Sequence, residues 1–432
     1  MSGHDFRLYR IGFIFVIFSC LCVYQFSHNY KHALALYPQL HTPNDTDTTS
    51  SYFSTNNITI NTNYEIVTTN YGWKSSNPNE YSQRMISQEF FNAVTSHTKY
   101  NSTANWDELN LNPNPNRRLV IFMDVDTCIE NNYPVYGVTW SENMARNVSD
   151  ENWNTVLDKS CVKLKKAAES PALKANPHSR LVILDCGNGP WYRLLDVCGA
   201  QSSSKINGGG WGDLLNNTQV ILAYYGTRTH EARSWDIGLP PPAVKAVNLS
   251  PHELLWLETC KPNRRYYLYS FQGRGGFRRD RLQNLDNGGD IYVKIRKEST
   301  YWGKSGDLYD YSEVMRNSMF AGAPKGDCLY SYRFAEAMSA ATIPVVYAND
   351  WLPPFSSPDD PDRVINWTKC MVHIREYQSV NTVQILRAIP EHVQCEMQKC
   401  ALAFWNEFGS SREGWLNGIL RWVNSDPRIR DS

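Results

Sequence analysis

The segment over residues 311–376 holds residue types and spacings that nucleotide recognition requires. The run Pro324-Lys325-Gly326 predicts a loop whose backbone can approach a ligand closely, and Ser331 stands where a helix N-cap is expected. A helix that begins there directs free N–H groups and the positive end of its dipole at this loop, which suits a phosphate. Arg333 and Glu336 stand three positions apart, so they share one face of that helix.

Arg333 and Glu336 together offer the two charges that a nucleoside diphosphate requires. A guanidinium grips phosphate oxygens, and a carboxylate accepts hydrogen bonds from ribose hydroxyls. The alternative interpretation is an exposed ion pair within one helix, which contributes only about 0.2–0.5 kcal/mol. The spacing by itself leaves both interpretations open.

The elements that must position these residues follow a repeating pattern. Short apolar runs, read as buried strands, alternate with helical stretches such as Tyr332–Ala341, and this order predicts a parallel α/β fold. Pro240-Pro241-Pro242 separates two such series, so we expect two Rossmann-like domains. The expected strands are Leu119–Met123, Leu181–Leu184, Val220–Tyr224, Arg265–Phe271, Ile291–Ile295, Met319–Ala321 and Ile343–Tyr347.

The chain is expected to divide into five segments. Residues 28–116 are rich in Asn, Thr, Ser and Tyr with little apolar periodicity, which predicts a largely disordered stem with one short helix at Tyr81–Val94. The predicted segments are a cytoplasmic tail (1–10), a membrane anchor (11–27), the stem (28–116), a first Rossmann-like domain (117–257) and a second one with final helices (258–432).

The N-terminus carries the signal that sets the compartment. Ile11–Phe26 is an apolar run of 16 residues, slightly under the range of about 17–25 for a spanning helix. Arg7 and Arg10 precede it and predict a cytoplasmic tail, hence a single-pass type II anchor in the Golgi or ER membrane. The alternative is a cleaved signal peptide ending near Ala33-Leu34-Ala35. Both interpretations place the rest of the chain in the lumen.

Glycosylation signals and cysteines fit a luminal location. Nine cysteines follow the apolar run; disulfides are permitted in that compartment, but their pairing does not follow from the sequence. Lys+Arg and Asp+Glu each number 43, and this balanced charge argues against nucleic acid as a partner. The predicted N-glycosylation sites are Asn44, Asn57, Asn101, Asn147, Asn216, Asn248 and Asn366.

A second motif follows the first expected strand. Asp124-Val125-Asp126 is a pair of carboxylates in the context that metal-dependent glycosyltransferases of the GT-A type use to hold a divalent cation on a diphosphate. It also suggests phosphatases with an aspartate nucleophile, although Cys128 stands where those favour Thr or Val.

Taken in order, the motifs of the second half resemble the exostosin-type glycosyltransferases. The resemblance covers roughly Asp236–Arg387 well and Arg118–Tyr225 weakly, and it departs from the family at Phe320-Ala321 and at Ala341-Thr342, where the family has Phe-Cys and Gly-Cys. The motifs are Asp236-Ile237-Gly238-Leu239-Pro240, Gln272-Gly273-Arg274, Ser331-Tyr332-Arg333-Phe334-Ala335-Glu336-Ala337, Ile343-Pro344-Val345-Val346, Leu352-Pro353-Pro354-Phe355 and Trp367.

The resemblance implies a GT-B architecture of two facing Rossmann-like domains. It further implies transfer of a sugar with inversion from a nucleotide sugar, usually a UDP-sugar, to a glycan or glycoprotein, with a divalent metal not required. The second domain would hold the donor and the first the acceptor and a general base. The implied donor-binding residues are Gly273, Arg274, Lys325, Gly326, Ser331, Arg333 and Glu336, and the candidate bases are His230, Glu231 and Asp236.

Within this set the resemblance gives several residues separate tasks. Arg274 would contact the diphosphate, Lys325 and Gly326 would line its loop, and Arg333 would neutralise charge as the leaving group departs. Glu336 would hold the ribose. The alternatives left open are a metal-dependent transferase that uses Asp124 and Asp126, and a non-catalytic sugar-binding subunit of a homo- or hetero-oligomer.

Overall fold

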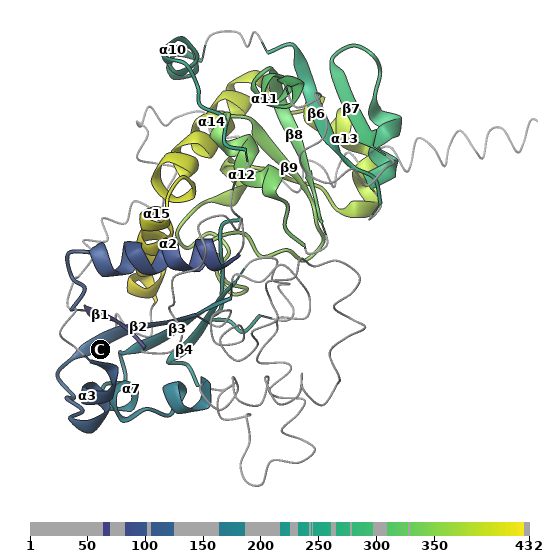
Figure 1. Cartoon of the computed structure of the whole chain (residues 1–432). Coiled ribbons are helices and arrows are strands. Elements are labelled where there is room, and N and C mark those ends of the chain that lie inside the picture. Colours follow the sequence, from purple (N-terminus) through teal and green to yellow (C-terminus); the bar gives the residue numbers. More distant parts are fainter. Residues whose placement is uncertain are drawn as a thin grey trace, which may run out of the picture.

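Two parallel β-sheets, each accompanied by helices, make up the described part of the chain (Figure 1). The computed structural model describes residues 64–69, 83–101, 105–124, 164–185, 217–224, 232–260, 265–296 and 309–426, apart from 242, 244, 277, 278, 327 and 328. The predicted α/β class is confirmed, and the two parallel sheets are consistent with a two-domain GT-B-like fold. The predicted tail and anchor lie outside the described residues. Among the residues described, no helix is both long and apolar enough to cross a membrane.

The first sheet is built from strands in the order of the sequence, β1-β2-β3-β4-β5, all parallel. Between their charged end residues, the central strands β2 and β3 are apolar, as expected for strands buried on both faces. The helices α2 (Gln83–Ser96), α3 (Trp106–Leu111) and α7 (Pro171–Lys174) belong to the same region. The strands are β1 (Tyr64–Thr68), β2 (Arg118–Asp124), β3 (Arg180–Asp185), β4 (Val220–Tyr224) and β5 (Ile237–Gly238).

Part of the predicted stem belongs to this first domain. Strand β1 pairs with β2 along its whole length, and Phe90 of α2 packs edge-on against Phe122 of β2. Trp106 and Leu109 of α3 are buried as well. The prediction that residues 28–116 are largely disordered is therefore wrong for β1 and α3, and the short helix predicted at Tyr81–Val94 is present as α2. The few apolar residues of this polar segment are enough to hold these elements in place, because they join a core whose other residues come from the strands that follow.

The second sheet has the strand order β10-β9-β8-β6-β7, again entirely parallel. From β6 the chain first adds β7 on one side and then returns to add β8, β9 and β10 on the other. This is the 2-1-3-4-5 order of doubly wound sheets, and its direction switches between β6 and β8. The strands are β6 (Tyr267–Arg274), β7 (Ile291–Arg296), β8 (Ser318–Pro324), β9 (Ile343–Tyr347) and β10 (Val372–His373).

Helices connect and cover the second sheet. Helix α12 buries Phe334, Ala337 and Met338, the face that its i, i+3, i+4 apolar spacing predicts. The predicted C-terminal helical stretch is present but interrupted by one π-helical turn. The elements are α10 (Pro251–Thr259), η3 (Arg279–Leu285), α11 (Tyr309–Arg316), α12 (Tyr332–Ser339), η5 (Trp367–Lys369), η6 (Glu376–Asn381), α13 (Thr382–Arg387), α14 (Glu391–Phe404), η7 (Trp405–Gly409) and α15 (Arg412–Ser425).

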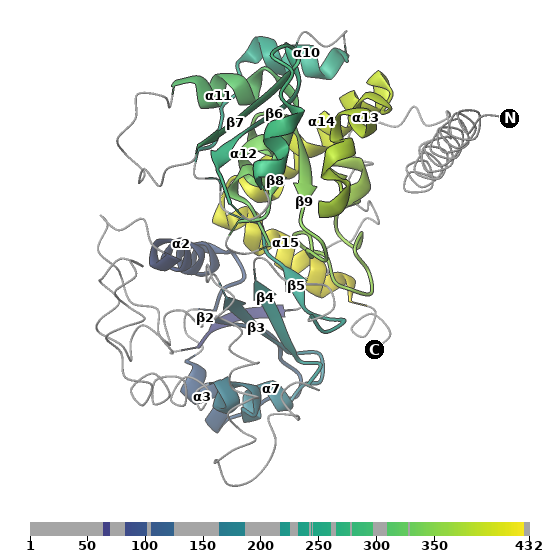
Figure 2. The same cartoon turned by 90° about the vertical axis from the view of Figure 1, so that its right-hand side faces the viewer.

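Within the described residues, the chain crosses between the two domains twice. It first passes from β5 to α10, and it returns through α15, which packs against α2 beside the first sheet (Figures 1 and 2). An ion pair between Arg412 and Glu89, 3.0 Å from Nε to Oε2, joins these two helices. Helix α10 packs on α14 of the second domain. The boundary predicted between residues 257 and 258 therefore falls within a helix that already belongs to the second domain.

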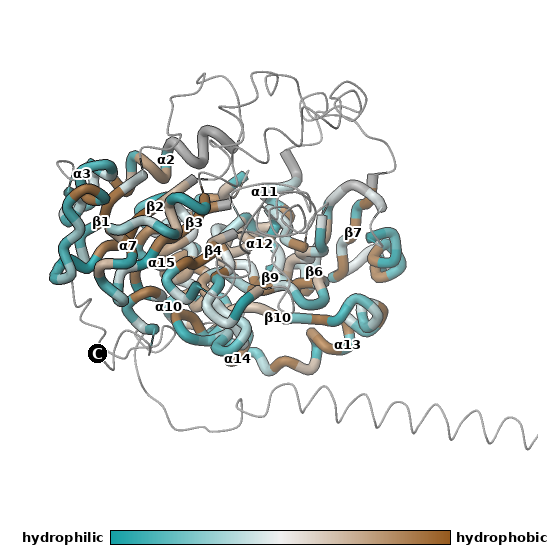
Figure 3. Tube along the Cα trace, turned by 90° about the horizontal axis from the view of Figure 1, so that it is seen from below, coloured by the Kyte–Doolittle hydropathy of each residue, from teal (hydrophilic) through white to brown (hydrophobic). Residues whose placement is uncertain are grey.

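One hydrophobic core continues from the first sheet into the second domain. It includes Phe122 of β2, Phe334 of α12 and Trp415 of α15, all at most 1% exposed. The hydropathy colouring shows hydrophobic segments along strands of both sheets (Figure 3). The two domains are thus held together by shared apolar burial, whose stabilisation grows with the area removed from water.

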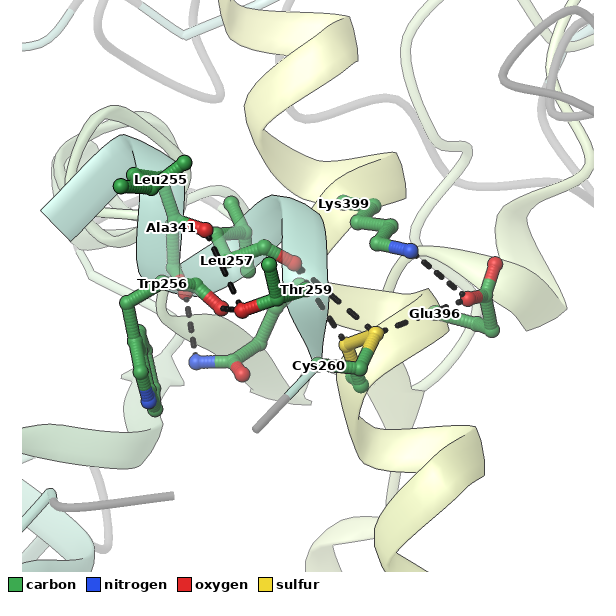
Figure 4. The surroundings of a disulfide bond; sticks show 10 residues. Leu255, Trp256, Leu257, Thr259, Cys260, Ala341, Glu396 and Lys399 are labelled. Carbon is green, nitrogen blue, oxygen red and sulfur yellow. Dashed lines mark hydrogen bonds and ion pairs between the residues drawn. A yellow bond between two sulfur atoms is a disulfide. The ribbon is translucent and has the colours of Figure 1, made fainter. Parts of the chain in front are cut away.

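Two disulfide bonds among the described residues reinforce the second domain. Cys260, directly after α10, is bonded to Cys395 on α14, which ties the segment between the domains to the C-terminal helices (Figure 4). Cys370 is bonded to Cys400, also on α14. Both pairings involve residues far apart in the sequence, so they depend on the tertiary fold.

Candidate functional site

The candidate site lies at the carboxyl ends of β6 and β8, where the strand order of the second sheet reverses. Strands that lead off in opposite directions leave a crevice at such a point, and ligands of doubly wound sheets bind there. Gly273 and Arg274 are the last residues of β6. Lys325 and Gly326 directly follow β8. The topology therefore brings together four of the seven predicted donor-binding residues.

Arg333 reaches from α12 to the end of β6. Its Nε donates to the carbonyl oxygen of Gln272 at 2.6 Å, and its guanidinium carbon lies 5.3 Å from the ring centroid of Phe271. A side chain on Gly273 would prevent this approach, since a Cβ there would lie 2.7 Å from Phe271 Cζ and 3.0 Å from Arg333 Nη2. Glycine in the Gln272-Gly273-Arg274 motif thus makes room for a cation at the switch point.

The loop after β8 is held by residues that sequence reasoning missed. Arg279, at the start of η3, donates to the carbonyl oxygen of Lys325 from Nε at 3.0 Å and from Nη2 at 2.8 Å. The Gly326 N–H donates to the carbonyl oxygen of Tyr330 at 3.2 Å. The Lys325 ammonium forms a 2.8 Å ion pair with Glu376, whose side chain is 9% exposed. A run of basic residues after β6 was the only sequence signal for Arg279.

Ser331 occupies the N-cap position of α12, as predicted. Its backbone is extended, with φ of −136° and ψ of 134°, and its side chain makes no capping hydrogen bond. The first N–H groups of the helix therefore do not donate to the Ser331 hydroxyl. Such an end carries a partial positive charge that favours an anion.

The Glu336 side chain is buried, although we expected it to face a crevice at the surface of the second domain. It is 4% exposed, and both of its carboxylate oxygens accept hydrogen bonds. The backbone N–H of Lys245 donates to Oε1 at 3.0 Å, and the hydroxyl of Tyr311 donates to Oε2 at 2.5 Å. Among the described residues these are its partners, and Arg333 is not one of them. The interpretation as an exposed ion pair within the helix is therefore wrong.

The environment of Tyr311 keeps its hydroxyl protonated. Burial raises the pKa of Tyr311 well above its ordinary value, and the negative charge of Glu336 raises that pKa further. Tyr311 is therefore a hydrogen-bond donor to the carboxylate at any physiological pH. Neither Tyr311 nor Lys245 carried a motif signal, because both contacts arise from chain segments far from α12 in sequence.

Of the three candidate bases, only Asp236 lies among the described residues. His230 and Glu231 lie outside the described residues. Asp236 is 1% exposed, forms a 2.6 Å ion pair with Arg233 and accepts a 3.0 Å hydrogen bond from the Leu222 N–H. Through these contacts Asp236 links β4 to the start of β5, so the role of this side chain is structural.

The remaining predicted positions are only partly described. Arg274 ends β6 and Asp124 ends β2, but the side chains of both, and the whole of Asp126, lie outside the described residues. In the described ranges, one group of residues has ligand atoms close enough for a metal: Cys260, Cys395 and Glu396. Its two cysteines form a disulfide, so it offers no thiolate to a metal (Figure 4).

Three predicted glycosylation sites are described. Asn248 is exposed, whereas Asn366 is half-buried and accepts a 2.6 Å hydrogen bond from the Thr368 hydroxyl. The Asn101 side chain donates to Glu65 of β1. Asn44, Asn57, Asn147 and Asn216 lie outside the described residues.

One departure from the resembled family has a visible backbone consequence. Ala341 follows α12 with a φ of 48°, the left-handed region that glycine adopts without steric cost. The family's glycine at this position therefore fits the turn between α12 and β9. Thr342, in place of the family's cysteine, donates hydrogen bonds to the carbonyl oxygens of Met315 and Ser318 at 2.8 and 3.2 Å.

Comparison with known proteins confirms the resemblance. Residues 215–389 match the family model of the Exostosin GT47 domain, a range that contains β6, β8, α12 and the switch point between them. The chain is 30% identical over 234 residues to Exostosin-1 of Bos taurus, and 28% identical over 216 residues to Exostosin-1c of Danio rerio. It is also 27% identical over 179 residues to the Exostosin-1 homolog of Caenorhabditis elegans. These matches support an exostosin-type glycosyltransferase domain over residues 215–389.

The matches cover part of each protein. They span 48%, 46% and 37% of this chain in the same order, and 30%, 28% and 45% of the relatives' own lengths. The chain therefore spans less than half the length of these relatives. The match to the family model covers the residues that carry the candidate site.

Proposed function

We propose that this chain is a glycosyltransferase of the secretory pathway that transfers a sugar, with inversion, from a UDP-sugar to a glycan or glycoprotein acceptor. The observation that carries the proposal is the gathering of Arg333, the Lys325-Gly326 loop and the N-terminus of α12 at the switch point of the second sheet. Arg333 and Lys325 bring cationic side chains to this point, which lies within the part of the chain that matches the Exostosin GT47 domain.

In this proposal, the cationic groups bind the diphosphate of the donor. Arg333 presents a planar guanidinium that can hold two phosphate oxygens, and Lys325 adds a second positive charge. Negative charge on the diphosphate grows as the glycosidic bond breaks, so fixed cations stabilise the transition state more than the ground state. Arg274, at the end of β6, would contact the same group.

Glu336 is proposed to accept a hydrogen bond from a ribose hydroxyl. A carboxylate oxygen has two acceptor sites, so each Glu336 oxygen retains one after its contact with Lys245 or Tyr311. Its low exposure supports a tight contact, since hydrogen bonds to charged groups contribute about 1.5–3 kcal/mol.

The first domain is proposed to bind the acceptor and to provide the general base. His230 and Glu231 remain the candidates, since the contacts of Asp236 give it a structural role. No divalent metal is required in this mechanism, because cationic side chains neutralise the diphosphate. The competing mechanism would place a metal on Asp124 and Asp126.

The proposed location is the Golgi or ER membrane, with Ile11–Phe26 as a type II anchor. Protease added to sealed microsomes should then leave the bulk of the chain intact, and a glycosidase should lower its apparent mass. Digestion of the bulk of the chain without detergent would refute this topology.

The donor site is tested by titrating UDP into the purified full chain and into Glu336→Gln and Arg333→Lys. Loss of a charge-assisted bond worth about 1.5–3 kcal/mol lowers UDP affinity roughly 10- to 150-fold in Glu336→Gln. Arg333→Lys should lower turnover as well as affinity, since a lysine lacks the planar fork. Matched controls are Glu258→Gln on the exposed face of α10 and Arg387→Lys, whose ion pair with Asp290 is largely exposed.

The controls should bind UDP as the unmodified chain does. Unchanged UDP affinity in both Glu336→Gln and Arg333→Lys would refute the placement of the donor. A chain that binds UDP but transfers no sugar to any acceptor would instead favour a non-catalytic sugar-binding subunit.

A further inference from the structure

The segment that links the two domains lies directly against the helix that carries Glu336. The Lys245 N–H donates to Glu336 Oε1, and two residues further along the chain the Val247 N–H donates to Ser339 Oγ at 2.8 Å. Ser339 in turn donates to the carbonyl oxygen of Glu336 at 2.6 Å. We call residues 245–250 the connector. Its backbone follows one turn of α12, contacting the Glu336 side chain directly and the Glu336 main chain through the Ser339 hydroxyl.

Helix α11 closes the other side of the same carboxylate. The Tyr311 hydroxyl donates to Glu336 Oε2 at 2.5 Å, and the ammonium of Lys245 lies 5.6 Å from the centroid of the Tyr311 ring. The Lys245 N–H therefore bonds to one carboxylate oxygen of Glu336. The Lys245 side chain lies against Tyr311, which bonds to the other oxygen. Within this group a single carboxylate is fixed from two directions.

Further contacts hold the connector and α11 together. Arg316, at the end of α11, donates to the carbonyl oxygen of Asn248 at 3.1 Å and lies 3.5 Å from Glu253. Val247 and Met315 are both buried in one small apolar cluster with residues of β8 and α12. The connector and α11 therefore support Glu336 together, so a shift in either of them changes the position of Glu336.

We propose that Tyr311 is a positioning residue for the donor site: with the connector, it orients the Glu336 carboxylate so that the remaining acceptor sites discriminate a ribonucleoside diphosphate from its deoxy forms. This inference rests on the proposed function, since it assumes that Glu336 binds ribose. A carboxylate held at both oxygens loses little rotamer freedom on binding, so a hydroxyl hydrogen bond to it is made at lower entropic cost. A site built to bond a hydroxyl rejects an analogue that lacks it.

The test compares Tyr311→Phe with Tyr347→Phe in the full chain. Tyr347 is a matched control because its hydroxyl is also buried and hydrogen-bonded, to Tyr269 at 3.1 Å and Thr382 at 3.0 Å, away from Glu336. Binding of UDP, 2′-deoxy-UDP and 3′-deoxy-UDP is measured by calorimetry, together with the melting temperature of each variant. The decisive quantity is the ratio of the affinity for UDP to that for the more weakly bound deoxy analogue.

Tyr311→Phe should lower this ratio roughly 3- to 10-fold, the effect of one lost hydrogen bond. Tyr347→Phe should keep the ratio of the unmodified chain, even where its melting temperature falls. A purely structural role for Tyr311 would lower stability in both variants and leave the ratio unchanged in both, which would overturn the inference. Should Tyr311→Phe fail to fold, Ser339→Ala removes the acceptor for the Val247 N–H and should lower the ratio from the connector side; an unchanged ratio there overturns the inference equally.

Glu336→Gln separates this inference from the proposed function. If Glu336→Gln loses UDP affinity and discrimination while Tyr311→Phe retains both, the donor site stands and the positioning role of Tyr311 is wrong. If Glu336→Gln itself binds all three nucleotides as the unmodified chain does, the donor site is wrong, and the positioning role falls with it.

Discussion

Gly238 is the residue at which substitution should disturb the contact between the two domains most severely. It ends β5 in the first domain, and its backbone bonds to the loop after β9 in the second. Its N–H donates to Ser356 at 3.3 Å, and its carbonyl oxygen accepts from the Phe355 N–H at 2.8 Å. A Cβ at this position would lie 2.3 Å from the carbonyl oxygen of Pro353 and 2.8 Å from that of Leu352.

Gly238→Ala must therefore displace the loop, and the structure allows the cost to be estimated. Overpacking against backbone costs about 1–3 kcal/mol, and the two hydrogen bonds contribute about 1 kcal/mol each. The loop has little freedom to retreat, because the space where a Cβ on Gly418 of α15 would stand is filled by the ring of Phe355. The free energy of unfolding should fall by about 3–5 kcal/mol, which is a large share of the roughly 5–15 kcal/mol of a typical protein.

The assay is thermal and denaturant unfolding of the purified full chain. At about 2–4 °C per kcal/mol for domains of this size, the melting temperature should fall by roughly 6–20 °C. Gly289→Ala is the matched control, since a Cβ there has no neighbour nearer than 3.5 Å. It should change the melting temperature little. Equal stability of Gly238→Ala and the unmodified chain would refute the reasoning that β5 is pressed against the second domain.

Three further predictions concern charge, metal and pH. Glu376→Gln leaves the Lys325 ammonium without the counter-charge now 2.8 Å away, so inorganic diphosphate should bind more tightly by calorimetry; weaker binding would show that Glu376 assists the anion. Sugar transfer should survive treatment with a chelator, and complete loss restored by added metal would favour the metal-dependent mechanism. Burial raises the pKa values of Tyr269 and Tyr347 above the ordinary value of 10.0, so their contribution to stability is complete below pH 10 and is lost as the pH rises beyond it. Tyr347→Phe should weaken this alkaline loss in pH-dependent unfolding, and an unchanged alkaline limb would contradict the assignment.

Local pattern was enough for the elements that carry the candidate site. The apolar runs before Gly273 and Lys325 became β6 and β8, and the apolar spacing around Arg333 became the buried face of α12. Such patterns are predictive because side chains repeat every two residues in a strand and about every 3.6 in a helix. The order of the motifs also identified the family that the comparisons confirm.

The polar N-terminal segment shows where local pattern failed. The strand β1 has too few apolar neighbours in sequence to predict burial, yet Ile66 is 1% exposed because β2 and α2 cover it. Composition measures what a segment could bury by itself. It does not measure what another segment can cover.

The sequence by itself determined the class of fold, the succession of strands and helices, and the cations that meet at the switch point, since these depend on short-range periodicity and motif order. Only the tertiary structure decided how Glu336 is held, how the chain returns to its first domain through α15, and which cysteines are paired. Lys245 is 91 positions from Glu336, and Cys260 is 135 positions from Cys395. Contacts over such separations depend on the packing of whole domains, and no local pattern records them.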